Sequence, residues 1–369
     1  MAYMRDPFSY RSLNPKIAGP GSTSAALIQY IDRKCVPLEV TMEITLDCNL
    51  RCLHCYNFNR TRGPSGKQDG FPLSEKEVLS VIDQVYDQGC LNITFSGGEP
   101  LLHPGLYDFS TYARNKHMGI YLKSNGTLFT EKSLRKLVEA RIMGIEVSLY
   151  GAGPETHDSF TGTPGSFSQS QEGITRVKDA GIHTRITFIM TRSNWGEADN
   201  MIRLAEEMEL EYGTNTQISR RYDGTSSSLD HQMTRQQLKQ LYSGPLRSHL
   251  PEPDFDPECS VQCGCARGVC GISAYGDVYP CIGAPLSAGN IRETPFADIW
   301  KNSDSLNKIR SLKLEDFKVC KSCPHRPYCR RSSGFVYVNT GNYTGTEEWT
   351  CMEAEVIHEV FEGRLRIED

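Results

Sequence analysis

Three cysteines stand close together in the stretch TLDCNLRCLHCYN, where Cys48, Cys52 and Cys55 follow one another. Thiolates at this spacing bind metal, and two kinds of site fit them. One is a zinc site completed by His54 or by a remote residue. The other is a cubane iron–sulfur cluster, which can accept three cysteines and leave one iron open to a ligand from solution. His54 stands between two of the cysteines, where its ring cannot easily reach the same metal, so the residues favour the cluster.

The chain holds 14 cysteines, and most of the others gather in its last third. Five lie within residues 259–281 and four within 320–351. In a reducing compartment such a set serves as metal or redox ligands rather than as disulfides. The C-x-x-C spacing among them suits structural zinc knuckles as well as iron–sulfur clusters. Cys35 and Cys90 stand apart, and we expect both to pack as small apolar side chains.

Composition limits the class of protein. With 369 residues, of which 38% are apolar and 23% charged, the chain is long enough for two domains and a sizeable core. The net charge of −5 and the scattered Lys and Arg argue against a nucleic-acid partner. The first residues contain no apolar segment typical of a signal peptide, and no run is long enough to cross a bilayer. We therefore predict a cytoplasmic protein with no nucleic-acid or membrane partner.

A repeating unit positions these residues: helical stretches end near a glycine, and an apolar β-prone run such as LNITFS, IYLKS, IEVSLY or HTRITFIM follows. Ser74 with Glu77 fits a capping box, and Thr130 is expected to cap the helix that follows it. With LEVTMEIT as the first strand, the pattern predicts about six βα units and a parallel sheet with helices outside. Six units are too few for a closed eight-stranded barrel, so we expect a partial (β/α)6 TIM-like barrel. The glycines expected to provide left-handed helix C-caps are Gly89, Gly119, Gly144, Gly181 and Gly213.

The active site of such a fold lies at the carboxyl ends of its strands. The three cysteines follow the first strand, SGGEP (96–100) follows the second, KSNGT (123–127) the third and SLYGAG (148–153) the fourth. Each of the later sequences taken alone is a common turn. Their conjunction behind a three-cysteine loop is what predicts a site at this rim.

The motif CxxxCxφC, with the aromatic His54 before its last cysteine, followed by GGEP, resembles the radical S-adenosylmethionine (radical SAM) superfamily over about residues 38–225. The resemblance implies that S-adenosylmethionine chelates the open iron of a 4Fe–4S cluster. Reductive cleavage then gives methionine and a 5′-deoxyadenosyl radical, which abstracts hydrogen from the substrate. By this resemblance Gly97 and Gly98 let the backbone approach the cofactor, and Glu99 accepts from its ammonium group. The residues assigned to the cluster and cofactor are Cys48, Cys52, Cys55, His54, Gly97, Gly98, Glu99, Asn125 and Ser148.

No catalytic acid or base is predicted. Several polar residues near strand ends each have a ready structural explanation, namely Tyr56, His103, Tyr150, His157 and Asp158. The family often carries an Arg where Thr161 stands, so Arg185 or another residue is expected to contact the cofactor carboxylate.

The later cysteines resemble the SPASM extension of radical SAM enzymes, which binds two auxiliary iron–sulfur clusters. The family's cysteine that completes the first of these clusters falls at Ser333. Either Cys263 or Cys270 substitutes as the fourth ligand, or one iron stays open to substrate; we expect substitution. The remaining ligands implied are Cys259, Cys265 and Cys281 for the first cluster, and Cys320, Cys323, Cys329 and Cys351 for the second.

SPASM proteins mostly act on peptides or proteins, so the resemblance implies a maturase that crosslinks, oxidises or epimerises a ribosomally made peptide. ISRRYDGTSSSLD resembles linker sequences of such maturases, including relatives of the pyrroloquinoline-quinone peptide cyclase. A sulfatase-type formylglycine maturase is disfavoured, because Ile282 stands where that branch carries Asp. The alternatives are a small-molecule enzyme, which removes haem-precursor side chains or dehydrogenates an alcohol, and a non-catalytic iron–sulfur scaffold or electron carrier.

Four segments are expected: an N-terminal arm (1–36), a radical SAM partial barrel (37–225), a bridging region (226–258) and a SPASM auxiliary-cluster domain (259–369). The arm is shorter than the winged-helix domain with which many maturases hold a leader peptide through an added strand. We therefore expect leader capture to need a separate leader-binding protein or another surface of this chain. The resemblance also implies an external one-electron reductant such as flavodoxin or ferredoxin.

Overall fold

The computed structural model describes residues 30–31, 33–60, 70–250, 252–253, 255 and 264–365. A nine-stranded sheet in the order β6-β5-β4-β3-β2-β1-β7-β8-β9 runs through it, and its first six strands are parallel neighbours. The sheet is not closed, which confirms the predicted partial barrel. These six strands are β1 (Glu39–Thr45), β2 (Asn92–Gly97), β3 (Gly119–Ser124), β4 (Gly144–Leu149), β5 (His183–Ile189) and β6 (Glu211–Asn215).

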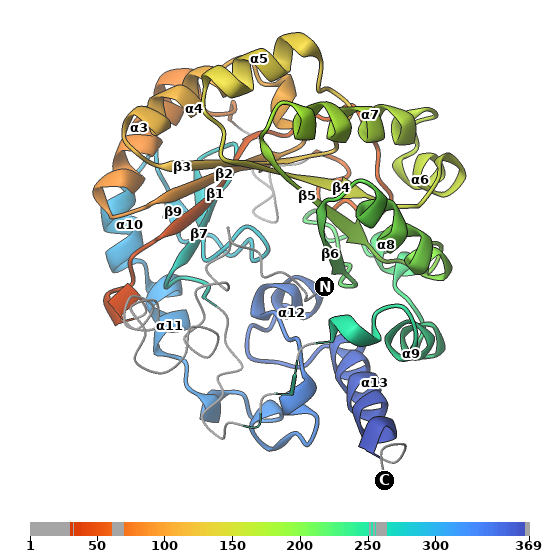
Figure 1. The fold of residues 1–369 in the computed structure, drawn as a ribbon. Coiled ribbons are helices and arrows are strands. Elements are labelled where there is room, and N and C mark those ends of the chain that lie inside the picture. Colours follow the sequence, from red (N-terminus) through yellow and green to blue (C-terminus); the bar gives the residue numbers. More distant parts are fainter. Residues whose placement is uncertain are drawn as a thin grey trace.

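Helices that alternate with the strands lie along the outer side of the curved sheet (Figure 1). Alternate side chains of each strand, such as Val40, Met42 and Ile44 of β1, join these helices in one apolar core. The residues between them, such as Glu43, therefore face the concave side. The helices are α3 (Glu75–Asp87), α4 (Leu106–Asn115), α5 (Glu131–Glu139), α6 (Pro154–Thr161), α7 (Ser166–Asp179) and α8 (Ala198–Glu207), with 3-10 turns at η2 (Pro100–Leu102) and η3 (Trp195–Glu197).

The helix starts agree with the sequence, whereas the helix ends agree only in part. Ser74 and Glu77 form the predicted capping box, and Thr130 caps α5. Gly89 and Gly181 have the left-handed backbone expected of them. The prediction is wrong for the three other glycines, because the chain turns two to four residues earlier, at non-glycine residues with positive φ. Those residues are His117, Arg141 and Glu209, while Gly119 and Gly144 begin strands and Gly213 lies within β6.

The C-terminal part continues the same sheet. β7 (Val269–Ile272) pairs in parallel with β1, with Cys270 opposite Val40, and the short strands β8 (Asp277–Tyr279) and β9 (Gly289–Asn290) follow antiparallel. The predicted boundary near residue 259 thus separates two segments that share one sheet, and the four segments stay a prediction.

The rest of this part is helical and irregular. α9 (Arg235–Ser243) packs beside α13 (Glu348–Leu365), where Arg235 pairs with Glu355. Between these helices in sequence lie α10 (Phe296–Asn302), α11 (Asp304–Ser311) and α12 (Ser333–Thr340). The 3-10 turns are η4 (Ser227–His231), η5 (Arg247–His249), η6 (Leu314–Asp316), η7 (Cys320–Ser322) and η8 (Arg326–Tyr328). Among the described residues, no helix is long and apolar enough to cross a membrane.

Candidate active site and auxiliary cysteine centres

The loop after β1 brings Cys48, Cys52 and Cys55 together. Backbone bonds fix it to the end of α6, from Arg51 N to Thr161 O (2.9 Å) and from Leu53 N to Phe160 O (3.0 Å). Burial raises the pKa of Cys52 to about 12 and that of Cys55 to about 11, and the neighbouring thiols add to both shifts. Buried thiols this close become thiolates when they bind cations, which fits the positively charged iron–sulfide core of a cluster.

His54 lies within an aromatic group. Its ring centroid is 5.3 Å from that of Phe160 and 5.1 Å from that of Tyr150. Burial lowers the pKa of His54 to about 4, so the ring is neutral, and its Nδ1 has no hydrogen-bond partner. The side chain packs the loop against its neighbours.

The two glycines of GGEP are required by the chain beside them. A Cβ on Gly97 would lie 2.1 Å from Thr45 O, and one on Gly98 would lie 2.0 Å from Asp47 O. Gly98 N donates to Thr45 O (2.8 Å) and Glu99 N donates to Asp47 O (2.7 Å). The GGEP backbone is therefore bonded directly to the chain that enters the cysteine loop.

Glu99 is fully buried, and its carboxylate accepts hydrogen bonds from the protein. The donors are Asn125 N (2.8 Å), Ser124 Oγ (3.0 Å) and Leu101 N (3.2 Å). Burial raises the pKa of Glu99 to about 7, against these hydrogen bonds, which lower it. The carboxylate thus fixes the end of β3, and its contact with a cofactor ammonium stays a prediction.

Asn125 and Ser148 lie at the same rim. Asn125 Nδ2 donates to Asn49 Oδ1 (2.9 Å) and lies 3.8 Å from Cys48 Sγ. Tyr150, two residues after Ser148, packs against Cys52, and burial and then the nearby Cys52 thiol raise the pKa of its hydroxyl. The structure therefore brings the residues predicted from four strand ends into one region.

The other polar residues near strand ends divide by their contacts. Asp158 accepts from Phe167 N (2.7 Å) and Gly165 N (2.6 Å), and His103 Nδ1 accepts from Gly105 N (3.0 Å), so both stabilise local turns. His157 is fully buried behind Tyr150, whose backbone N–H donates to its Nδ1 (3.3 Å). Arg185 lies on β5 opposite Glu146; burial raises the pKa of Glu146, but Lys123 and then Arg185 lower it below its usual value.

Glu43 is a residue of the site that the sequence analysis missed. It lies 4% exposed on the concave face of β1, and Tyr56 OH donates to its Oε1 (2.7 Å). Burial raises its pKa to about 7. The Tyr56 ring is 4.5 Å from that of Tyr222, whose hydroxyl donates to Ile282 O, next to Cys281. The signal was available in LEVTMEIT, where an acid interrupts a buried strand, and the contacts link the first cysteine loop to the C-terminal part.

The later cysteines divide into two places. Cys320, Cys323, Cys329 and Cys351 lie close together. Burial, and then the charges of neighbouring thiols in this set, raise the pKa values of Cys320, Cys329 and Cys351, that of Cys329 to about 12. Cys281 lies in the turn after β8, and Cys265 is buried just before β7. Cys270 faces the apolar core beside Cys90. Cys259 and Cys263 lie outside the described residues. Cys48, Cys52 and Cys55 of the first loop, and Cys320, Cys323, Cys329 and Cys351, are free thiols.

Ser333 lies at the start of α12, against the turn that follows Cys281. A Cβ on the next residue, Gly334, would lie 2.6 Å from Gly283 O, so the two backbones touch. The Ser333 side chain is fully buried, and its hydroxyl accepts from the Arg331 guanidinium. The position where the family has a cysteine is thus beside the first auxiliary site and is held by an arginine.

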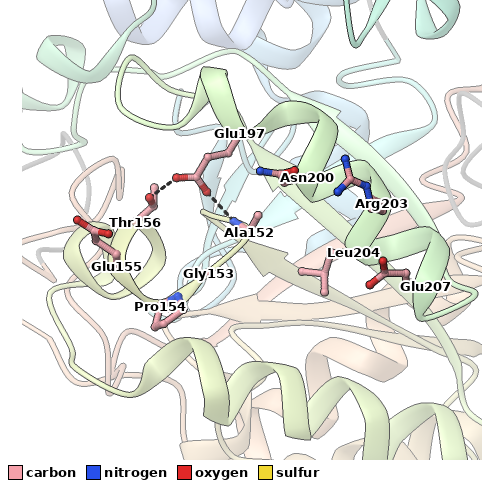
Figure 2. Close-up of a pocket in the computed structure, with 10 residues that line it drawn as sticks. All are labelled: Ala152, Gly153, Pro154, Glu155, Thr156, Glu197, Asn200, Arg203, Leu204 and Glu207. Atoms are coloured by element: carbon pink, nitrogen blue, oxygen red, sulfur yellow. Dashed lines mark hydrogen bonds between the residues drawn. The ribbon is translucent and has the colours of Figure 1, made fainter.

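An open pocket of about 600 Å³ lies elsewhere, between α6 and α8 on the outer side of the sheet (Figure 2). Glu197 closes one side of it by accepting from Ala152 N (2.8 Å) and from the Thr156 hydroxyl. None of the predicted site residues lines it, so it is separate from the cysteine loop. Among the described residues, no three His, Cys, Asp or Glu side chains are placed to hold a single metal ion.

Comparison with known proteins agrees with this site. Residues 42–205 match the radical SAM superfamily, and residues 263–324 match SPASM, an iron–sulfur cluster-binding domain. The AdoMet-dependent heme synthase of Methanosarcina barkeri is 29% identical over 343 residues, which cover 85% of this chain and 96% of that protein. The mycofactocin maturase MftC of Mycobacterium tuberculosis is 30% identical over 315 residues, which cover 80% and 77%. The crystal structure of Streptococcus suis SuiB bound to S-adenosylmethionine superposes with a TM-score of 0.64 at 15% identity, covering 89% and 81%.

A curved parallel sheet with a three-cysteine loop and GGEP at its rim defines the radical SAM class of enzymes. This chain belongs to that superfamily and carries a SPASM domain. Its cofactors are S-adenosylmethionine, a 4Fe–4S cluster and auxiliary iron–sulfur clusters, as predicted. The assignment of single residues to these groups stays a prediction.

Proposed function

We propose that this enzyme modifies a ribosomally made peptide, which it crosslinks, oxidises or epimerises after removing a hydrogen atom. When bound, the cluster and S-adenosylmethionine supply the 5′-deoxyadenosyl radical. The observation that carries the radical chemistry is the convergence of Cys48, Glu99 and Asn125 at neighbouring strand ends. Kinship with the mycofactocin maturase supports the peptide substrate.

The protein's own residues hold and protect the reacting groups. Cys48, Cys52 and Cys55 would bind the cluster, and the Tyr150 hydroxyl would donate to the Cys52 sulfur. Glu99 fixes Asn125 near Cys48, where its amide can meet a cofactor hydroxyl or carboxylate. The aromatic group around His54 excludes water from one side of the loop.

The test is anaerobic reconstitution with iron and sulfide, followed by S-adenosylmethionine and dithionite. We expect 5′-deoxyadenosine and methionine in equal amounts, and a mass change in a short peptide encoded beside this protein. Cys90→Ala is the matched control, because that buried cysteine lies away from the loop. Zinc without sulfide in the purified protein, or no 5′-deoxyadenosine, would contradict the proposal that this protein performs radical chemistry.

A second candidate is removal of side chains from a haem precursor. It is favoured by the match to the heme synthase, which spans 96% of that protein. A porphyrin with propionate side chains should then lose carboxyl groups during 5′-deoxyadenosine formation, while the peptide keeps its mass. Running both substrates in parallel decides between the two.

The partners beyond the substrate are also proposals. A flavodoxin or ferredoxin would supply single electrons, and a separate small protein would capture the leader peptide. Weak peptide binding by the isolated chain, measured by fluorescence anisotropy, agrees with the second; tight leader binding counts against it. A cytoplasmic location is proposed because free thiols persist in a reducing compartment.

A further inference from the structure

A buried arginine stands between the two auxiliary cysteine centres. Arg331 is only 9% exposed, and its guanidinium stacks over the fully buried Phe317 ring at 4.9 Å. Its Nη2 donates to Tyr343 O (2.6 Å) and Gly345 O (3.0 Å). These contacts hold a permanent positive charge in one orientation inside the C-terminal part.

The same guanidinium lies beside both centres. Toward the second centre it stacks on Phe317, whose carbonyl accepts from Lys321 N (2.9 Å), the residue after Cys320. Burial raises the pKa of the Cys320 thiol, and the charge of Arg331 acts against that shift. Toward the first centre its Nη1 donates to Ser333 Oγ (2.5 Å), whose neighbour Gly334 packs on the turn after Cys281. One side chain therefore connects the two places where thiols gather.

The positive charge of Arg331 bears on how easily a cluster at this place is reduced. A cubane cluster with four thiolates carries net negative charge, and reduction adds another electron. After burial and the neighbouring thiols, two nearby acids also raise the pKa values of these cysteines, Glu347 that of Cys351 and Glu353 that of Cys329. Hydrogen bonds to cluster sulfurs and positive charge nearby both favour the reduced state, more strongly where water is excluded.

We propose that Arg331 raises the reduction potential of the second auxiliary cluster. The same side chain connects that cluster to the first centre through its hydrogen bond to Ser333. The Ser333 hydroxyl is then a hydrogen-bond acceptor for Arg331 and leaves the first cluster without a protein ligand from position 333. Arg331 is a positioning residue, and its effect does not depend on which substrate the enzyme takes.

The test is a redox titration followed by electron paramagnetic resonance. The reconstituted full chain carries Cys48, Cys52 and Cys55→Ala, which removes the signal of the radical SAM cluster. The signal that disappears on adding Cys329→Ala is assigned to the second auxiliary cluster. In Arg331→Gln, we expect the ratio of reduced to oxidised second cluster at a fixed potential to fall at least tenfold, which is 59 mV for one electron. Arg331→Lys keeps the charge and should lose less than half of that shift.

Lys321→Met is the matched control. It removes a positive charge next to Cys320, but from an exposed side chain that solvent screens, so its ratio should change less than threefold. A change below threefold in Arg331→Gln would overturn the proposal. If neither Arg331 variant retains the second cluster, by iron count and signal, the arginine is only structural and the proposal also fails.

Ser333→Ala tests whether Ser333 is a hydrogen-bond acceptor for Arg331 and not a ligand of the first cluster. The iron content should be unchanged, because the hydroxyl is not a ligand. Loss of about four iron atoms, or of the first cluster's signal, would identify Ser333 as a ligand and overturn its assignment. Since these measurements use no substrate and no S-adenosylmethionine cleavage, their failure is distinguishable from failure of the proposed function.

Discussion

The cysteine loop after β1 and the C-terminal segment around Cys320 gather thiols by different means. The first loop is bonded to α6, to GGEP and to the end of β3, and its aromatic neighbours pack it from one side. The second set stands on the short turns η7 and η8 and on one helix, α13. Between residues 314 and 331 the structure has only 3-10 turns.

The difference concerns what the fold supplies before metal binds. The first loop is organised by protein contacts, so binding iron adds little order to it. The second segment has little regular structure, so the metal must stabilise it as a staple does. We infer that protein contacts fix the geometry of the first cysteine loop before iron binds. The segment that carries the second set of cysteines depends on its bound cluster for stability.

The largest expected effect comes from removing the first set of thiols. Replacing Cys48, Cys52 and Cys55 by Ala should bring 5′-deoxyadenosine formation to background and lower the iron content by about four atoms of about 11–12. The free energy of unfolding should change by less than about 2 kcal/mol, since protein contacts hold the loop. Iron quantitation, chromatography and chemical denaturation measure the three. Loss of nearly all iron would show that the centres are not independent.

The next largest effect is expected from removing the metal, which should change the two cysteine regions to different degrees. In apoprotein, amide hydrogens of residues 314–331 should exchange at least tenfold faster than in reconstituted protein, because their turns lose the cluster. Residues 48–58 should change less than threefold under the same conditions. Hydrogen exchange with mass spectrometry checks this. An equal acceleration of exchange in both segments would show that the protein does not stabilise the first loop more than the second segment.

Acid should lower the free energy of unfolding because His157, in α6 beside the first cysteine loop, is buried in its neutral form. Burial lowers the pKa of His157 to about 4, below the usual value near 6.5, so the unfolded chain binds a proton that the folded protein excludes. Its contribution to stability is present above pH 6.5 and is lost as the pH falls toward 4, by on the order of 2–3 kcal/mol. Denaturation at both pH values measures the loss, which His157→Gln should reduce. The exposed His117→Asn is the control, and an equal slope in both variants would contradict the assignment.

The smallest effect is expected at Cys270, one of two alternatives for the missing ligand. Its side chain faces the core beside Cys90, so Cys270→Ala should keep the full iron content and cost about 1 kcal/mol of stability. Iron quantitation and denaturation check both. A loss of about four iron atoms would make Cys270 a ligand after all.

The sequence predicted the barrel and its rim because both rest on local patterns. Strands alternate with capped helices, and GGEP follows its strand directly, so Ser74, Thr130 and Glu99 fall where expected. The hydrogen bonds that Glu99 accepts from Ser124 and Asn125 could not be predicted, since these donors reach it through tertiary pairing. The link from Glu43 through Tyr56 and Tyr222 to the Cys281 turn joins distant segments, which no local spacing encodes.

The pairing of β7 with β1 also limits how the protein can be divided. A shortened chain that stops before residue 264 would leave residues 39–42 of β1 on a free strand edge. Such an edge invites association between copies and aggregation. The catalytic and auxiliary parts are therefore poor candidates for exchange between enzymes, and chimaeras should join them outside this pair of strands.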